Sequence, residues 1–504
     1  MSFARSASCL ISLCLGLFAC GRAPALQVLG DSTRLEKSEP SPKRSAFFDG
    51  KKVSLRAARG ETLGLSVRIG DGRSRRVRLE LPKAAAAVSA FSVGSLEVKE
   101  PSTQMYGRSL GKGMYPDVLT PKSGDVEATD LAYFDVAVGR DTAPNRYQGM
   151  LSVNDERFPV ELEVSSARIE IERDPLVWVF YLPREIARAH GLPDGDQPEL
   201  IEREAEYHRL FREHGTFLAA DLAPARFPAR KRFVTGVKYW PVAIDASTDE
   251  SIDRDVKQWL ELFRGSSVVP FAIPIDEPHT AEQKQRALHI AEAVGRAGGG
   301  RPHFLRAVTD AAEPIYRDSM DIFFSPKNLP AAKQQRSARG ELFFTYNGRP
   351  PEAGSMILDT DGVALRTWGW IAERYGIELW YAWEGLYFTD RYNKGGPTDV
   401  MRDPVTFDER SRGGSDFGNS DGLLVYPGPL PSLRLKALRR GLQDRLLIRQ
   451  LASCGGADQA RAIVERAVPR ALGEAGTTPS WSLEEPTWER ARRELLDRIE
   501  ATCH

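Results

Sequence analysis

Two adjacent carboxylates follow a short apolar run near the middle of the chain. Asp276 and Glu277 come directly after residues 271–275 (FAIPI), and Pro278 and His279 follow them. If the run is a strand of a parallel barrel, these side chains lie at its carboxyl end, where barrel active sites are found. Two carboxylates in one site repel each other, which raises one pKa and leaves the other group ionised. Such a pair suits glycoside hydrolysis, in which an acid works beside an anionic stabiliser.

The same short motif has a second interpretation. Helix N-termini often carry an Asp that accepts backbone N–H bonds, and Asp276 fits that role as well. The residue before a proline favours an extended backbone, so Pro278 predicts that conformation for Glu277. Spacing alone leaves the catalytic and capping interpretations open.

Aromatic residues gather on the later strand candidates. Trp380, Tyr381 and Trp383 lie where a predicted strand becomes a loop, and such rings stack on the apolar faces of sugars. The alternative is that the aromatic rings only fill the core. We prefer that alternative for Phe343, Phe344, Trp368 and Trp370.

Several function classes find no support in the sequence. Nucleotide-binding glycine motifs, the zinc-protease motif, paired CxxC and the serine-hydrolase elbow are all missing, and the seven His residues lack ligand spacing. We therefore expect no metal and no cofactor. Lys plus Arg and Asp plus Glu both total 69, so no net charge attracts a phosphate backbone, and nucleic acid is not an expected partner.

The pattern of apolar residues divides the chain into parts. Residues 47–170 alternate apolar and polar positions between frequent turn signals, which predicts a β-sandwich. Residues 175–450 alternate helical segments with short apolar runs, which predicts a (β/α)8 TIM-like barrel, with an open doubly wound sheet as the alternative. Residues 451–504 are expected to form a short helical tail.

The amino-terminal residues are typical of an exported lipoprotein. Residues 1–20 contain Arg5, an apolar stretch too short to span a bilayer, and a box ending in Cys20, which predicts a signal peptide and lipidation of Cys20. The alternative is an ordinary signal cleaved near Ala25. Residues 21–46 are interpreted as a flexible tether. We expect a bacterial cell-envelope protein held to the membrane by lipid only, in the outer membrane, with neither its membrane face nor its oligomeric state defined by sequence.

Two further cysteines lie in the predicted tail. Cys454 and Cys503 are the thiols left after the signal peptide and Cys20, in a compartment that permits disulfides. They either form one disulfide or remain two separate thiols.

Residues 421–428 (DGLLVYPG) and 431–444 (PSLRLKALRRGLQD) resemble the carboxyl-terminal signature of glycoside hydrolase family 123. The resemblance extends in patches to 276–278, 343–348, 380–383 and 144–153. It implies a β-sandwich followed by a (β/α)8 barrel and an exo-acting β-N-acetylgalactosaminidase that retains configuration by substrate-assisted catalysis. Glu277 would protonate the glycosidic oxygen, and Asp276 would orient the 2-acetamido group and stabilise the charged intermediate.

The same resemblance supports substrate contacts at Tyr346, Asn347, Trp380, Tyr381 and Trp383. The strand at 343–346 departs from the family order of Trp and Tyr, which bears on the sugar that is recognised. We therefore expect a glycoside hydrolase (class EC 3.2.1) acting on terminal β-linked N-acetylhexosamine. The alternatives are a glycan-binding lipoprotein without turnover and a structural envelope lipoprotein.

Overall fold

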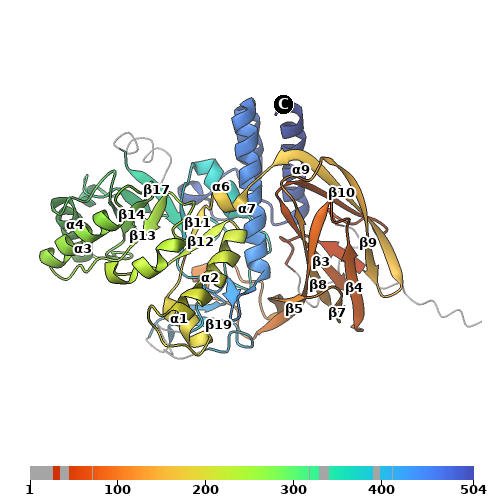
Figure 1. Cartoon of the computed structure of the whole chain (residues 1–504), viewed down its shortest axis with the longest axis horizontal. Coiled ribbons are helices and arrows are strands. Elements are labelled where there is room, and N and C mark those ends of the chain that lie inside the picture. The colour runs from red at the N-terminus through yellow and green to blue at the C-terminus, as the bar shows by residue number, and fades with distance from the viewer. Residues whose placement is uncertain are drawn as a thin grey trace, which may run out of the picture.

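The computed structural model describes residues 26–34, 45–70, 72–316, 318–327, 340–389, 398–410 and 413–503. Cys20 and the signal peptide lie outside these residues. Figure 1 shows the sandwich on the right, the barrel on the left, and a long helix, α7, between them. Within the described part, no helix has the length and apolar character needed to cross a bilayer.

The amino-terminal part is two five-stranded sheets around a shared apolar core. One sheet has the order β1-β3-β8-β5-β6 and the other β2-β10-β9-β4-β7. Its strands are β1 (Leu26–Leu29), β2 (Val53–Arg59), β3 (Thr62–Ile69), β4 (Arg75–Glu80), β5 (Ala86–Val98), β6 (Gly113–Lys122), β7 (Val126–Ala128), β8 (Leu131–Val138), β9 (Asn145–Val153) and β10 (Glu156–Arg168). Alternate residues such as Val53, Leu55 and Ala57 on β2 enter the core, as period-two patterning requires.

The sandwich begins earlier than predicted. Leu26 and its three successors form β1, whose residues are all buried and pair antiparallel with β3. The backbone N–H groups of Gly30 and Ser32 donate to the Glu485 carboxylate, at 3.0 and 2.8 Å. The predicted tether over 21–46 is therefore wrong for 26–34, because an apolar LQVL segment completes the sheet edge.

The central part is a nearly closed barrel of eight parallel strands. The strands are β11 (Val177–Phe180), β12 (Thr216–Ala219), β13 (Tyr239–Pro241), β14 (Val269–Ala272), β15 (Leu305–Val308), β16 (Ile322–Phe324), β17 (Leu342–Tyr346) and β18 (Trp380–Ala382). Their order is β12-β11-β18-β17-β16-β15-β14-β13. At the gap, Phe217 of β12 stacks on Trp240 of β13 with ring centroids 5.8 Å apart, and Leu222 O accepts from Ala243 N at 3.1 Å. β12 and β13 stand at the two ends of this order, so the contact between them excludes the open doubly wound sheet.

The helices around the barrel are less regular than a complete (β/α)8 pattern. α1 (Pro183–Ala189) and α2 (Pro198–Glu213) follow β11, α3 (Asp249–Leu262) follows β13, α4 (Ala281–Arg296) follows β14, and α6 (Thr367–Tyr375) follows β17. After β12 the described residues form only the short 3-10 helices η3 (Pro224–Arg226) and η4 (Pro228–Phe233), and after β15 only η5 (Pro314–Tyr316). Each of these turns begins with a proline, a residue that suits the first turn of a helix. The predicted eightfold alternation is thus incomplete.

A segment of short strands separates the last barrel strand from α7. It contains β19 (Val405–Asp408), β20 (Phe417–Asn419), β21 (Val425–Tyr426) and β22 (Leu430–Pro431). The sandwich loop carrying η1 (Gln104–Tyr106) is bonded to it, because Ser102 Oγ donates to Asp359 and accepts from the Asn419 backbone N–H, at 2.6 and 2.9 Å. The second sandwich turn, η2 (Ile171–Arg173), leads into β11.

The helix α7 (Leu433–Leu451) carries charged residues that are buried. Arg440 pairs with Glu61 of the sandwich and with Glu489 of α9 (Glu485–Thr502), at 2.6 and 2.8 Å. Arg366, just before α6, pairs with Glu489 at 2.7 Å and with Asp444 of α7 at 2.8 Å. We call this cluster the ionic seam; it consists of Glu61, Arg366, Arg440, Asp444, Glu489 and Arg492. The seam joins the sandwich, the barrel and the terminal helix.

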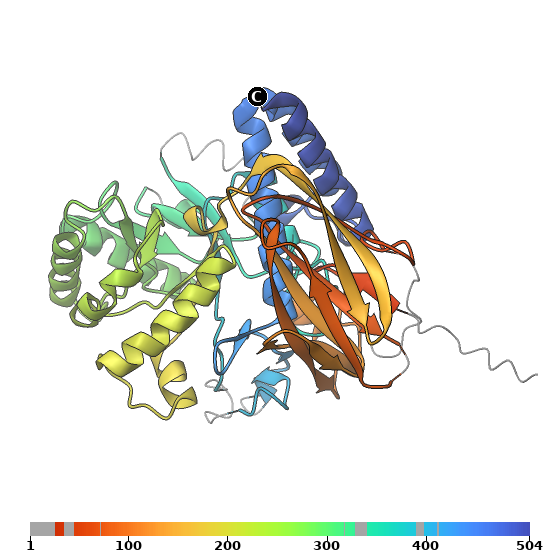
Figure 2. The ribbon, with the colours of Figure 1, turned by 45° about the vertical axis from the view of Figure 1, so that its right-hand side comes forward.

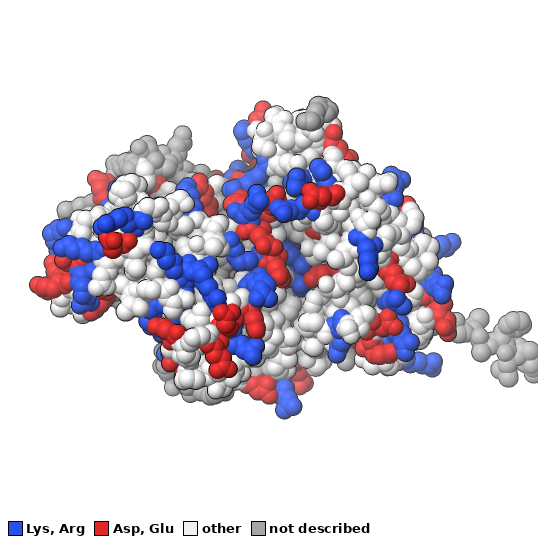
Figure 3. Space-filling model, in the orientation of Figure 1, with Lys and Arg blue, Asp and Glu red and all other residues white. Residues whose placement is uncertain are grey.

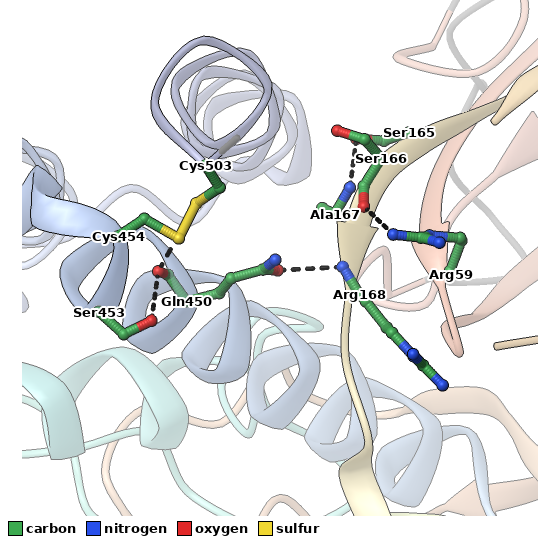
Figure 4. The surroundings of a disulfide bond; sticks show 9 residues. All are labelled: Arg59, Ser165, Ser166, Ala167, Arg168, Gln450, Ser453, Cys454 and Cys503. Carbon is green, nitrogen blue, oxygen red and sulfur yellow. Dashed lines mark hydrogen bonds between the residues drawn. A yellow bond between two sulfur atoms is a disulfide. The ribbon is translucent and has the colours of Figure 1, made fainter. Parts of the chain in front are cut away.

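The terminal helices complete the molecule. The π turn η7 (Ala452–Gly456), α8 (Ala457–Ala467) and η8 (Leu472–Glu474) connect α7 to α9, which Figure 2 shows alongside α7 and the sandwich. Cys454 and Cys503 form a disulfide between η7 and the end of α9 (Figure 4). Of the two possibilities for these cysteines, the structure therefore shows the disulfide and not two separate thiols. Beside it, Gln450 Oε1 accepts from the Arg168 backbone N–H of β10 at 3.1 Å.

Candidate active site

Asp276 and Glu277 lie beyond β14, at the carboxyl end of the barrel, and both are solvent-accessible. Glu277 has φ +44°, so its backbone is left-handed and not extended as Pro278 predicts. A left-handed non-glycine residue is strained and persists only where its surroundings hold it. That turn lets two neighbouring side chains take part in one site although they would alternate along a strand.

Thr309, the residue after β15, is hydrogen-bonded to both residues of the pair, to the backbone of Glu277 and to the carboxylate of Asp276. Its Oγ1 accepts the Glu277 backbone N–H at 2.6 Å and donates to Asp276 Oδ1 at 2.7 Å. The N-cap of α4 is Thr280, which forms a capping box with Gln283. The capping interpretation of Asp276 is therefore wrong.

Glu277 has a second partner on β17. The Tyr346 hydroxyl donates to Glu277 Oε1 at 2.6 Å, while His279 Nε2 lies 3.9 Å from Oε2. Burial and the Glu277 charge raise the pKa of Tyr346 far above its ordinary value, so the phenol stays neutral and remains a donor. This contact directs Oε1 toward Tyr346, while Oε2 lies on the side of His279.

The carboxyl groups differ in electrostatic environment. Desolvation by surrounding protein atoms raises the pKa of Asp276, the Glu277 charge adds to the rise, and the Thr309 hydrogen bond opposes it. Asp221, two residues after β12, was not predicted. Although solvent reaches its side chain, desolvation raises its pKa to about 6, and the Asp276 charge contributes. The sequence could have indicated Asp221, because this residue follows the buried strand at 216–219 much as Asp276 follows β14.

Three of the predicted aromatic contacts are partly accessible at this end of the barrel. The Tyr381 ring stacks on Trp178 of β11, with centroids 4.1 Å apart and planes at 17°, and lies 6.4 Å from the Tyr346 ring. Tyr381, Tyr346 and Trp383 are all half-buried. The rings of Trp178 and Tyr381 and the Tyr346–Glu277 contact thus form a continuous run of side chains.

Trp380 and Asn347 have structural roles. Trp380 is fully buried and stacks on Trp368 at 4.8 Å, so the prediction that it contacts substrate is wrong. Strand alternation explains the difference, because Trp380 and Tyr381 point to opposite faces. Asn347 joins β17 to β18: its N–H donates to Tyr381 O at 2.7 Å, and its Oδ1 accepts the Trp383 N–H at 2.9 Å.

A second acidic residue missed by sequence reasoning lies beside Trp383. Asp421 Oδ1 accepts from Trp383 Nε1 at 3.1 Å, and Asp421 is 4% exposed. Burial raises the pKa of Asp421 to about 6, and the Trp383 hydrogen bond opposes that rise. Asp421 belongs to the 421–428 motif, but nothing in the sequence indicates which side chain it contacts.

Charges of both signs are mixed on one face of the molecule. Lys and Arg side chains are interspersed with Asp and Glu over the face in Figure 3, in line with the zero net charge. Across the described residues, no group of three or more His, Cys, Asp or Glu has an arrangement that could hold a metal ion.

Comparison with known proteins gives structural likeness without sequence likeness. No protein-family model and no curated protein sequence matches the chain. A solved family 123 glycoside hydrolase from Clostridium perfringens, described in connection with glycolipid glycan hydrolysis, is 10% identical with a TM-score of 0.64, over 95% of this chain and 97% of that one. The two proteins share a fold. An Ig-like-domain xylanase of family 10 from termite gut is 9% identical over 62% of this chain and 90% of its own, with a TM-score of only 0.29.

Proposed function

We propose that this protein is a glycoside hydrolase that removes terminal β-linked N-acetylhexosamine, of the N-acetylgalactosamine type, with retention of configuration. The observation that carries the proposal is the pair Asp276–Glu277 at the carboxyl end of the barrel, held by Thr309 and Tyr346. The shared fold with a family 123 glycoside hydrolase supports it.

Each carboxyl has a distinct role in the proposed reaction. Glu277 gives its proton to the glycosidic oxygen as the bond to the anomeric carbon breaks. The acetamido oxygen of the substrate attacks that carbon and forms an oxazolinium ring, while Asp276 accepts the acetamido N–H and offsets the positive charge. Water then attacks the anomeric carbon, the bond from that carbon to the acetamido oxygen breaks, and the water proton passes to Glu277, which restores both the acetamido group and the acid. The nucleophile is thus part of the substrate, an exception to the two-carboxylate scheme.

The test compares the full chain with two isosteric variants on aryl β-glycosides. We expect the wild type to hydrolyse an aryl N-acetyl-β-galactosaminide, and Glu277→Gln and Asp276→Asn each to lower kcat by about 10²- to 10⁴-fold. An aryl β-galactoside without the acetamido group serves as the matched substrate and should not turn over. Equal turnover of both substrates would reject substrate assistance, and no turnover of any glycoside would reject the enzyme proposal.

The alternatives have less support. A glycan-binding protein without turnover gains if Asp276 is buried in a cap interaction or if Glu277 faces away from the cleft. Asp276 is instead bonded to Thr309, and both carboxylates are accessible. Half-buried aromatic side chains beside the pair likewise favour a carbohydrate partner over a purely structural envelope role.

We also propose that Cys20 carries the lipid that holds the protein at the bacterial outer membrane, from the sequence pattern of residues 1–20. Labelling with radioactive palmitate tests this proposal. Incorporation should occur in the wild type and be lost in Cys20→Ser, and labelling that survives the substitution would contradict it.

A further inference from the structure

An aromatic cluster lies across the barrel from the carboxylate pair. In the order of the eight strands, β18 is four places from β14 in either direction around the barrel, so the residues after these strands lie on opposite sides. Trp383 follows β18, and its ring lies 5.1 Å from Tyr387 and 6.2 Å, edge-on, from Phe407. Phe407 in turn meets Tyr106 of the sandwich at 6.4 Å. We call these four residues the aromatic wall.

The indole of Trp383 is held in a fixed orientation. Asp421 Oδ1 accepts its Nε1–H, and Asn347 Oδ1 accepts its backbone N–H, at 3.1 and 2.9 Å. Gly422 has φ +68°, and a Cβ there would lie 2.9 Å from Trp383 Cζ2. The consecutive residues Asp421 and Gly422 therefore fit against the indole, one as an acceptor and the other by its lack of a side chain.

Hydrogen bonds from a sandwich loop hold the segment that precedes Asp421. Thr103 Oγ1 donates to Asp416 at 2.9 Å, and the Ser102 hydroxyl accepts the Asn419 backbone N–H at 2.9 Å. Asp416 and Asn419 shortly precede Asp421 in the sequence. Tyr106, in the same sandwich loop, packs against Phe407 and is only 7% exposed. The wall thus has a rigid support that spans two parts of the molecule.

We propose that Trp383, oriented by Asp421, selects the galacto configuration of the terminal sugar. This inference rests on the proposed function. In this proposal the pyranose ring lies across the barrel mouth, with C1 at Glu277 and C4 on the side that carries Trp383. An axial O4 leaves the hydrogens on C3, C4 and C5 as one apolar face, which an aromatic ring can cover, whereas an equatorial O4 lacks that arrangement. Asp421 is a positioning residue that acts through Trp383.

The test measures kcat/KM of the full chain on aryl N-acetyl-β-galactosaminide and N-acetyl-β-glucosaminide. We expect Trp383→Leu to lower kcat/KM on the galacto substrate about tenfold and to change the gluco value much less, so that the ratio falls. Asp421→Leu should lower the ratio in the same direction. Asp421→Asn keeps an acceptor oxygen for the indole and should restore most of the ratio.

The outcomes separate the two proposals. A galacto-to-gluco ratio that is unchanged in Trp383→Leu, in an active enzyme, would overturn the specificity role. A ratio that falls in Trp383→Leu but stays at the wild-type value in a folded Asp421→Leu would overturn the positioning role of Asp421. Circular dichroism melting identifies unfolded variants, and Trp383→Leu decides the case if Asp421→Leu does not fold. A wild type that hydrolyses neither sugar would instead reject the proposed function on which the inference rests.

Discussion

The Thr309 hydroxyl connects the two residues of the proposed catalytic pair. It receives one hydrogen bond from the backbone of Glu277 and gives one to the side chain of Asp276. Because the bond it donates favours the ionised form of Asp276, it opposes the desolvation that raises the pKa of that group. The position of the acid and the charge of the stabiliser therefore depend on the same atom.

Replacing this hydroxyl should move the pH dependence of turnover. In Thr309→Val the pKa of Asp276 rises further, because a bond that favours the carboxylate is lost. Since the proposed reaction needs Asp276 ionised, the acidic limb of the kcat/KM profile should shift to higher pH. Thr309→Ser, which keeps the hydroxyl, is the matched control and should return the limb toward its wild-type position. An unshifted profile in the Val variant would show that Thr309 does not tune Asp276.

The buried carboxyl of Asp421 gives a prediction about stability. Its pKa of about 6 in the folded protein exceeds the ordinary 3.8, so the folded state binds its proton more tightly than the unfolded chain does. Stability then falls as pH rises between these two values. Asp421→Asn should therefore raise the free energy of unfolding at pH 7 by up to about 3 kcal/mol, an advantage that shrinks toward zero below pH about 4.

Urea unfolding at several pH values checks this prediction. The control is Asp141→Asn, whose side chain is 93% exposed and which should change stability by less than about 0.5 kcal/mol at any pH. If Asp421→Asn is less stable than the wild type at pH 7, the negative charge of Asp421 supports the fold and the prediction is wrong.

Sequence reasoning named Asp276, Glu277 and Tyr346 as site residues, but it did not indicate that Tyr346 and Thr309 contact the carboxylate pair. Asp276 and Glu277 stand out because they follow a clear apolar run. Thr309 and Tyr346 contact them from 32 and 69 residues away along the chain, a relation that depends on which strands become neighbours. Trp380 was mistaken for a surface contact because an aromatic cluster at a strand end does not reveal which ring faces inward.

At the scale of elements, the backbones of α6 and α7 approach each other closely. A Cβ on Gly441 would lie 2.2 Å from the Arg366 carbonyl oxygen, and one on Gly369 would lie 2.1 Å from the Gly441 carbonyl oxygen. The backbones cross where neither residue has a side chain. Gly441 belongs to the 431–444 motif, so its presence there has a packing explanation.

A methyl group at this crossing should be costly. Gly441→Ala should lower the free energy of unfolding by about 1–3 kcal/mol or more, because the two helices must separate. The matched control is Gly295→Ala in α4, where the new Cβ would be 3.6 Å from the nearest atom. That change should be neutral or stabilising by up to about 1 kcal/mol, since alanine favours helix. Equal effects of the two substitutions in chemical denaturation would contradict the crossing argument.

Strand positions were easier to predict than their surroundings. The apolar run at 342–346 coincides with β17, and the run at 271–275 overlaps the last two residues of β14, because buried parallel strands are nearly continuously apolar. β1 was missed because four apolar residues beside a polar stretch carry little periodicity. The buried charges of α7 were also missed, because charged positions on a helix normally face water.

At the scale of the molecule, the ionic seam makes the parts interdependent. Arg440 is 3% exposed and faces Glu61 from the sandwich and Glu489 from α9. The neighbouring cations and especially Arg440 hold the pKa of Glu489 well below its ordinary value, against the effect of burial. Both carboxylates depend on this arginine for compensation.

Removing that arginine should destabilise the whole chain. Arg440→Leu leaves two buried carboxylates with reduced compensation and should lower the free energy of unfolding by about 3–5 kcal/mol. Calorimetry should show a lower midpoint for the main transition. Arg410→Leu, at a surface pair with Glu100, is the control, with an expected effect below about 1 kcal/mol. A midpoint equal to that of the control variant would show that the seam contributes little.

The position of β1 has a consequence for where the proposed enzyme would act. It is the edge strand of its sheet, and only the five residues 21–25 separate it from Cys20. A fully extended chain of that length reaches at most about 18 Å. With a lipid on Cys20, as proposed, this short segment would keep the edge of the sandwich close to the bilayer surface. Encounters with substrate would then resemble a two-dimensional search, in which glycans borne on or near the same membrane are favoured over sugars released into the surrounding fluid.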